Sequence, residues 1–211
     1  MSHTRCVGAL LAGGTATRFA GMPKGLAVID GLRIADRAMV ALRGATDRQI
    51  VIANDERATR WFPNVPIVRD AEPGLGPLAG LRTALKAAEG AALLVVAWDM
   101  PFVTSALLAA LRELGEAGAS AAMPAHGSPP MLEPLCAYYS SEALAACERL
   151  LSNGERRAHA LFDVLPNARR LEGAALRALG DPSWLLRSVD TTESLVALGG
   201  WLPPGEDAAR R

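Results

Sequence analysis

The sequence predicts an α/β fold, a single domain with a mostly parallel central sheet and helices on both faces, and three observations predict it. Residues 6–12 and 92–97 are short, continuously apolar runs, which are typical of strands buried on both faces of a parallel sheet. Such runs alternate with segments of helical spacing, for example residues 33–42. Glycine-rich or acidic residues follow the two runs directly. This alternation predicts a doubly wound sheet with its ligand site at the carboxyl ends of the strands.

The expected elements follow one another along the chain. Strands are predicted at residues 6–12, 49–53, 65–68, 92–97, 119–123, 135–139 and 185–189. Helices are predicted at residues 33–42, 77–88, 105–114 and 142–151, with a short helix after the turn at 153–157 and another near 192. Pro77 suits a first helical turn, where its missing N–H is not needed, and Thr104 or Ser105 offers an N-cap oxygen.

Length and composition predict one domain. The chain has 211 residues, of which 50% are hydrophobic and 21% charged, enough for one sizeable core. We expect residues 1–202 to form this domain and the polar residues 203–211 to be disordered. The formal net charge is zero, which argues against binding to nucleic acid or to an anionic membrane surface.

The cysteines and the hydropathy pattern predict a cytoplasmic protein. Cys6, Cys136 and Cys147 are odd in number, far apart and without zinc-ligand spacing, so we expect buried thiols in a reducing compartment. No segment reaches the roughly 18 consecutive apolar residues that span a bilayer.

The first candidate site is the glycine-rich loop after the first predicted strand. Its residues are Leu11, Ala12, Gly13 and Gly14, and the cations Arg18 and Lys24 follow them. The glycines let backbone N–H groups approach a triphosphate closely, while the cations hold it and offset the charge that develops at phosphorus. The spacing matches neither a Walker A loop nor a dinucleotide-binding fingerprint. A glycine turn with solvated basic side chains is the alternative.

Two carboxylates form the second candidate site. Asp99 follows the strand at 92–97, where α/β sheets place their ligands, and Mg²⁺ bridging phosphate oxygens would compensate its charge. Asp190 follows the strand predicted at 185–189 and adds a second carboxylate to the same ion. The alternatives are capping of the next helix by Asp99 and a favourable charge at a helix N-terminus for Asp190.

The third candidate site is a glycine-rich turn that enters the helix at 77–88. The turn consists of Gly76, Pro77, Leu78, Ala79 and Gly80. Its small residues permit close approach of a flat ligand, and a helix N-terminus favours anions. Asp70, after the strand at 65–68, offers acceptors to a ribose or to an amino-bearing base. A tight turn packed on the sheet and a turn role for Asp70 are the alternatives.

In this order, the elements resemble the molybdenum cofactor guanylyltransferase family. Its pattern L-A-G-G-x-x-x-R-[MF]-G-x-x-K-G-L is matched between Leu11 and Leu26, with Ala20 as one extra small residue. Further matches are Asn54, Asp70, the segment from Gly76 to Gly80, Asp99-Met100-Pro101-Phe102, Glu133-Pro134-Leu135 with Tyr138, and Gly154-Glu155-Arg156-Arg157. The resemblance covers roughly residues 6–198.

The resemblance implies a Rossmann-like nucleotidyltransferase fold and a Mg²⁺-dependent transfer of GMP from GTP to the phosphate of molybdopterin, the molybdenum cofactor, with release of pyrophosphate. It implies that Leu11, Ala12, Gly13, Gly14 and Lys24 hold the phosphates, and that Asn54, Asp70, Gly76, Pro77, Leu78 and Gly80 lie near guanine and ribose. Arg18, Lys24 and Asp99 would be catalytic, because an anionic acceptor needs alignment and charge neutralisation rather than a general base. Transient contact with molybdoenzymes or their chaperones is also implied.

The sequence departs from the family pattern at two places. Trp98 stands where relatives often have a small residue or cysteine, and residues 187–192 read R-S-V-D-T-T where the family usually reads N-x-N-T-P. We expect Ser188 to contact the substrate and Asp190 the metal. Arg156 and Arg157 are candidates for the cofactor phosphate, because guanidinium groups match phosphate oxygens, with a solvated helix start as the alternative.

Two other functions stay open. One is a cytidylyltransferase for the same cofactor or a transferase for another phosphorylated acceptor, although the paired glycines Gly13 and Gly14 look more like the guanylyl branch. The other is a catalytically inactive protein that binds and delivers the nucleotide or cofactor. Trp61 is expected to pack, and His126 lies in a loop that is exposed or covers the pterin.

Overall fold

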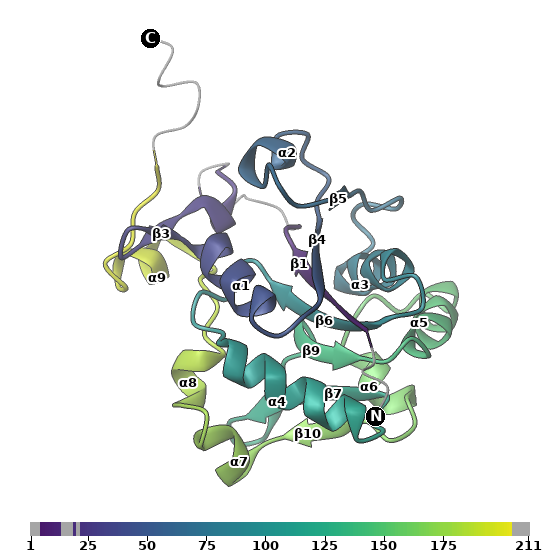
Figure 1. Cartoon of the computed structure of the whole chain (residues 1–211). Helices are drawn as coiled ribbons and strands as arrows, with labels where there is room; N and C mark the ends of the chain where they lie inside the picture. The colour runs from purple at the N-terminus through teal and green to yellow at the C-terminus, as the bar shows by residue number, and fades with distance from the viewer. Residues whose placement is uncertain (1–4, 14–18, 20–21, 204–211) are drawn as a thin grey trace.

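The computed structural model describes residues 5–13, 19 and 22–203. It shows one eight-stranded sheet, with strand order β10-β7-β9-β6-β1-β4-β5 and β8 paired to β7, surrounded by helices (Figure 1). The sheet consists of β1 (Cys6–Leu11), β4 (Arg48–Ile52), β5 (Ile67–Val68), β6 (Ala92–Ala97), β7 (Ala121–His126), β8 (Met131–Leu132), β9 (Cys136–Tyr139) and β10 (Arg169–Leu171). Gly14, Arg18 and residues 204–211 of the expected tail lie outside the described residues.

The helices and a separate hairpin complete the fold. The α-helices are α1 (Ile34–Arg43), α2 (Ala58–Trp61), α3 (Pro77–Ala87), α4 (Ser105–Glu116), α5 (Ala143–Ser152), α6 (Ala160–Val164), α7 (Gly173–Arg177), α8 (Pro182–Leu185) and α9 (Thr192–Val196). A 3-10 turn, η2 (Lys24–Leu26), precedes the antiparallel hairpin of β2 (Val28–Ile29) and β3 (Leu32–Arg33).

The strand directions confirm a mostly parallel sheet. β1 pairs in parallel with both β4 and β6, and β4–β5 and β7–β10 are also parallel pairs. β9 lies antiparallel between β6 and β7. The carboxyl ends of β1, β4 and β6 therefore meet at one edge of the sheet, where the sequence predicts the ligand site.

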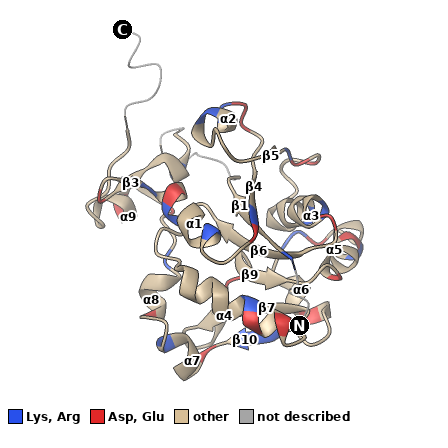
Figure 2. Ribbon diagram, viewed as in Figure 1, with Lys and Arg blue, Asp and Glu red and all other residues tan. Residues whose placement is uncertain are grey.

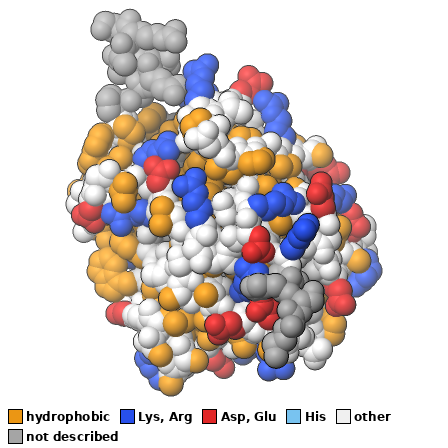
Figure 3. Space-filling view, viewed as in Figure 1, with side chains coloured by type: hydrophobic (Ala, Val, Ile, Leu, Met, Phe, Trp, Pro, Cys, Tyr) orange, Lys and Arg blue, Asp and Glu red, His pale blue; other side chains and the backbone are white. Residues whose placement is uncertain are grey.

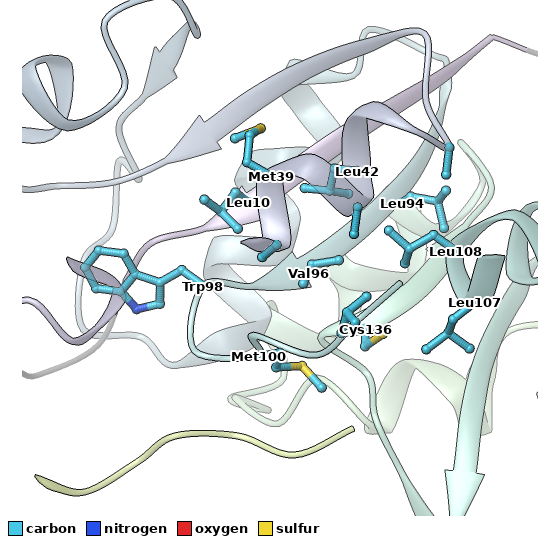
Figure 4. Close-up of a cluster of buried hydrophobic side chains, with 14 of the residues drawn as sticks. Leu10, Met39, Leu42, Leu94, Val96, Trp98, Met100, Leu107, Leu108 and Cys136 are labelled. Atoms are coloured by element: carbon cyan, nitrogen blue, oxygen red, sulfur yellow. The ribbon is translucent and has the colours of Figure 1, made fainter. Parts of the chain in front are cut away.

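Alternate residues of each central strand pack against opposite layers of helices. In β1, Leu10 belongs to a core with α1 and α4, whereas Ala9 belongs to a second core with α3 and α5. Figure 4 shows the first core, in which side chains of α1 and α4 pack on the sheet and Trp98 lies at one end of the cluster. Helices thus cover both faces, as the apolar runs predict (Figure 1).

The helix starts follow the expected capping chemistry. Thr104 caps α4, because its hydroxyl accepts a hydrogen bond from the Leu107 N–H at 3.2 Å. Pro77 lies in the first turn of α3. α9 begins with a capping box in which Thr191 and Ser194 bond to each other's backbone N–H groups.

The prediction of a strand at residues 185–189 is wrong. Pro182–Leu185 form α8, whose N-cap Asp181 accepts a hydrogen bond from the Ser183 N–H at 2.9 Å. Residues 187–190 form a loop without strand pairing in the part of the chain that is described. Leu186 completes the core beside α8, so the apolar character that predicts a strand serves a helix end and a loop.

A third, smaller core joins early and late parts of the chain. It contains Phe19, Ile29, Ile34, Val189 and Leu195 among its buried residues. Val28 and Trp201 exchange two backbone hydrogen bonds, each 2.9 Å long. The hairpin that follows Lys24 is therefore held by the segment that follows Asp190.

The surface agrees with a zero net charge. Basic and acidic residues are interspersed along the elements of the ribbon in Figure 2. Hydrophobic side chains gather on the left edge in Figure 3, over β3 and α9, where Leu32, Val196 and Trp201 are exposed.

The three cysteines are free and buried, as expected. Among the described residues, no helix has the length and apolarity needed to cross a membrane.

Candidate functional site

A cavity of about 590 Å³ opens at the carboxyl ends of the central strands. Leu11, Ile52 and Ala97, the last residues of β1, β4 and β6, line it together with residues of the loops that follow. Lys24 and Asp99 both line this cavity, so the cation and the carboxylate that follows β6 share one cleft.

Lys24 lies between two carboxylates. Its Nζ donates hydrogen bonds to Asp99 Oδ2 and to Asp190 Oδ1, the latter 3.0 Å away. The Asp99 side chain is 10% exposed and that of Asp190 is 54% exposed, so the first carboxylate lies inside the cleft and the second at its rim. Asp99 caps no helix, because Thr104 caps α4.

The charges of this cluster depend on one another. Burial raises the pKa of the Asp99 carboxyl, and the Lys24 ammonium only partly offsets this. Burial disfavours the charged form of Lys24, but attraction to Asp99 and hydrogen bonds to both carboxylates outweigh it, so the pKa of Lys24 is raised. A carboxylate at Asp99 therefore needs a cation close by.

Backbone contacts bring the three charged side chains together. The Val189 N–H donates to the Asp99 carbonyl at 2.9 Å, which fixes the loop carrying Asp190 beside the end of β6. Lys24 opens η2, and the next residue, Gly25, packs on Trp98: a Cβ at Gly25 would lie 2.3 Å from Trp98 Cε3. Only glycine permits η2 to approach β6 this closely.

The carboxylates suit a divalent cation. Asp99 Oδ1 is buried and has no hydrogen-bond partner among the described residues, so one oxygen of this carboxylate is left to a ligand. Within the same residues, no three His, Cys, Asp or Glu side chains group closely enough to hold a metal alone. Two carboxylates plus phosphate oxygens and water form the kind of ligand set that Mg²⁺ accepts.

The predicted nucleotide-binding residues mostly line the same cavity. Leu11, Ala12, Gly13, Asn54, Asp70, Gly76, Pro77 and Gly80 do so. Two of them also bond to each other: the Asn54 side-chain oxygen accepts from the Asp70 N–H at 2.9 Å. The Asp70 carboxylate in turn accepts from the Thr83 hydroxyl at 3.0 Å, so these residues also shape the cavity wall.

The start of α3 is built for close backbone contact. Gly76 has a φ of 81°, and a Cβ there would lie 3.1 Å from the Arg156 carbonyl oxygen. That oxygen also accepts a hydrogen bond from the Leu78 N–H at 3.2 Å. The Leu78 side chain is fully buried in the core rather than in the cavity.

A second cavity, of about 320 Å³, adjoins the first. Both are lined by Pro77, Ala97, Asp99 and Leu135, so they meet at the buried carboxylate. Arg157 and Ser188, two of the residues predicted to bind the substrate, line the second cavity. Neither cavity is lined by Arg156, whose guanidinium bonds to the Leu151 and Glu155 carbonyls.

Several residues line the cavities although the sequence did not predict a place for them in the site. Trp61 and Trp98 line the first cavity with ring centroids 6.2 Å apart, and the Arg57 guanidinium lies 5.3 Å from the Trp61 ring centroid. Trp61 packs, as expected, but it also lines the cleft. Glu133 and His159 line the second cavity. Glu133 belongs to a segment that matches the family pattern, but the sequence gives it no role, and no sequence pattern places Trp61 in the cleft.

Comparison with known proteins finds a matching family and similar sequences. Residues 8–171 match the family model described as the MobA-like NTP transferase domain. A probable molybdenum cofactor guanylyltransferase of Chloroflexus aggregans is 34% identical over 159 residues, covering 74% of this chain and 75% of that protein.

Two solved structures show the same fold. Molybdopterin-guanine dinucleotide biosynthesis protein A from Archaeoglobus fulgidus is 24% identical with a TM-score of 0.75, covering 97% of this chain and 100% of that chain. A Mycobacterium tuberculosis protein solved in complex with manganese is 19% identical with a TM-score of 0.66, covering 92% and 98%. The expected nucleotidyltransferase fold is confirmed.

Proposed function

The chain belongs to the MobA-like NTP transferase family, and from that premise we propose that it transfers GMP from GTP to the phosphate of molybdopterin, with Mg²⁺ as cofactor. The observation that carries the proposal is the contact of Lys24 with Asp99 and Asp190 at the junction of two cavities. The matched relatives named as molybdenum cofactor guanylyltransferases support the choice of nucleotide and acceptor.

The nucleotide is assigned to the larger cavity. Gly13 lines this cavity and can offer its backbone N–H to the phosphates, and Lys24 supplies a positive charge in the same cavity. Arg18 is proposed as a second cation from the glycine-rich loop. Asn54, Asp70 and the start of α3 line the part assigned to guanine and ribose.

The acceptor is assigned to the smaller cavity. Its lining includes Arg157, which matches phosphate oxygens, and Ser188. Because the two cavities share Asp99, a phosphate in the second lies next to the α-phosphate of a nucleotide in the first. We assign the reaction to the cytoplasm, in keeping with three free, buried thiols.

The chemical step exchanges one P–O bond for another. An oxygen of the acceptor phosphate attacks the α-phosphorus of GTP, the bond from that phosphorus to the bridging oxygen breaks, and pyrophosphate leaves. The attacking oxygen is already anionic, so the protein's role is alignment and charge neutralisation. Lys24 offsets the charge that develops on the phosphoryl oxygens, and Asp99 and Asp190 would hold the metal. Mg²⁺ bound there would withdraw charge from the same oxygens.

The Asp99→Asn variant tests the metal role. It removes the buried charge with little change in shape, so Mg²⁺-dependent pyrophosphate release from GTP and molybdopterin should fall below detection while most GTP binding remains. Asp30→Asn is the matched control, because Asp30 lies on the exposed turn between β2 and β3. Wild-type turnover in Asp99→Asn would remove Asp99 from the metal site.

Nucleotide choice is tested by supplying GTP and CTP in parallel with molybdopterin. We expect pyrophosphate release with GTP and little with CTP. A preference for CTP would replace the guanylyl assignment by the cytidylyl alternative. Binding of GTP without any turnover would instead favour the delivery protein, against which the contact of Lys24 with Asp99 argues.

A further inference from the structure

Glu133 lines the second cavity and has no part in the chemistry described above. It lies between β8 and β9, and its side chain is 26% exposed. His126, at the end of β7, places Nε2 3.2 Å from Glu133 Oε1. An imidazole therefore contacts one oxygen of a carboxylate that borders the acceptor cavity.

The backbone around Glu133 is held firmly. Its N–H donates to the Pro124 carbonyl at 3.1 Å, and its own carbonyl accepts from the Cys136 N–H at 3.0 Å. The next carbonyl, that of Pro134, accepts from the hydroxyl of the buried Tyr139 at 2.8 Å. A carboxylate on so fixed a segment is positioned before a ligand arrives, which favours selective recognition.

The apolar surroundings of the Glu133 carboxylate favour a ligand that brings hydrogen-bond donors. Ala97, Met100, Pro134 and Leu135 give the cavity an apolar lining suited to a flat ring. Burial raises the pKa of Glu133, an effect that the contact with His126 only partly offsets. An ionised carboxylate is an acceptor only, so a ligand with adjacent N–H donors would stabilise it.

We propose that Glu133 selects the ring of the acceptor by accepting hydrogen bonds from the adjacent N–H groups of a 2-amino-4-oxo heterocycle, as in a pterin, and that His126 is its positioning residue. The inference rests on the proposed function and specifies its acceptor. Guanine carries the same donor edge. Glu133 lines the smaller cavity and is absent from the lining of the larger one, which favours the acceptor as the ligand.

The test compares two fluorescent probes on the full chain. Pterin-6-carboxylate has the 2-amino group, and lumazine-6-carboxylate has an oxygen in its place. The wild type should prefer the pterin, and Glu133→Gln should weaken pterin binding at least tenfold while lumazine binding changes little. Glu142→Gln, at an exposed position before α5, is the matched control and should keep the wild-type preference. An unchanged preference in Glu133→Gln, or none in the wild type, overturns the proposal.

A second pair of ligands tests whether Glu133 recognises the acceptor or guanine. ITP lacks the 2-amino group of GTP, so the ratio of their dissociation constants reports on recognition of that edge. Glu133→Gln should leave this ratio at its wild-type value. A ratio that falls toward one would assign Glu133 to guanine and overturn the proposal.

These titrations do not depend on turnover. If GTP and molybdopterin give no pyrophosphate while Glu133→Gln still abolishes the pterin preference, the proposed transfer fails and the role of Glu133 stands. If turnover occurs and the preference is unchanged, only the role of Glu133 fails.

The positioning role of His126 has its own readout. His126→Ala should weaken pterin binding several-fold in the wild-type background and not in Glu133→Gln, because the two residues act through one contact. His126→Gln keeps a side-chain N–H donor and should restore most of the loss. Additive losses in the double variant would overturn the positioning role.

Discussion

Lys24 has one structural role that its contacts show and one catalytic role that we propose. Its ammonium group compensates the buried carboxylate of Asp99, and under the proposed function it also neutralises the charge that develops on a phosphate. A single substitution removes both, so activity and stability need to be measured together.

For activity, we expect Lys24→Met to lower the kcat/KM of pyrophosphate release by roughly 100-fold, about 3 kcal/mol, the scale of losing one preorganised charged or donor group. Steady-state kinetics with GTP and molybdopterin measures this. A wild-type rate would exclude Lys24 from catalysis.

For stability, Lys24→Met should lower the melting temperature, because Asp99 is 10% exposed and loses its cation. Adding Asp99→Asn to Lys24→Met should restore part of the lost stability and none of the activity. Thermal unfolding followed by circular dichroism provides the measurement. A double variant less stable than Lys24→Met would show that the charge of Asp99 is not what destabilises the single variant.

Gly25 leads to a packing prediction. Gly25→Ala would press a methyl group into Trp98, so we expect a loss of about 1–3 kcal/mol of unfolding free energy, the usual effect of overpacking, together with reduced activity. Urea unfolding and turnover measure the two effects. Combining Gly25→Ala with Trp98→Leu should recover part of the stability. Equal stability of Gly25→Ala and wild type would refute the close packing of Gly25 on Trp98.

At this scale the sequence predicted the residues that follow strong local signals. A glycine loop with cations and an acid after an apolar strand were sufficient to name Lys24 and Asp99. The contacts of Gly25 with Trp98 and of His126 with Glu133 depend on tertiary packing, which leaves no spacing pattern in the chain.

Among the elements, α4 provides a clean comparison of two neighbouring hydroxyls. Thr104→Ala removes the N-cap bond to Leu107 and should reduce the unfolding free energy by about 1 kcal/mol without changing kcat. Ser105→Ala, within the first turn, should change it by less than about 0.5 kcal/mol. Chemical denaturation measures the unfolding free energy of both variants. An equal loss of unfolding free energy in the two would contradict capping by Thr104 alone.

The predictable elements are those whose burial is periodic over several residues. β1, β4, β6 and α1 are close to their predicted bounds because both faces of each strand, or one stripe of the helix, must be apolar. Residues 185–189 were misassigned because Leu185, Leu186 and Val189 serve different cores. Asp181 before Pro182 was the helix-start signal that should have prevailed. The two-residue strands β2 and β3 were missed, because they are too short for any period.

For the molecule as a whole, burial controls cysteine chemistry. Burial raises the pKa of Cys6 and of Cys147 to about 12, so both remain neutral thiols at pH 8. Mass spectrometry after iodoacetamide treatment at pH 8 should show no adduct on the native protein and adducts on all three cysteines in urea. Modification of the native protein would show that the core opens readily.

The same shifts predict a loss of stability at alkaline pH. The unfolded thiols lose protons near their ordinary pKa of 9.0, while the folded thiols keep them to about 12. The folded state then binds more protons, so the unfolding free energy should fall as pH rises above about 9. Urea titrations at pH 8 and pH 10 test the sign, and greater stability at pH 10 would contradict it.

The small core shared by Phe19, Ile29, Val189 and Leu195 has a consequence for the order of events during synthesis. The ribosome completes the glycine loop and Asp99 long before it reaches Asp190, and the hairpin beside Lys24 gains its last pairing partner only with Trp201. A nascent chain halted before this point would hold a nearly finished sheet, but the hairpin beside Lys24 would lack its pairing with Trp201. If the proposed function holds, we expect turnover to begin only after translation has passed residue 201, because the hairpin beside Lys24 lacks its pairing partner until then.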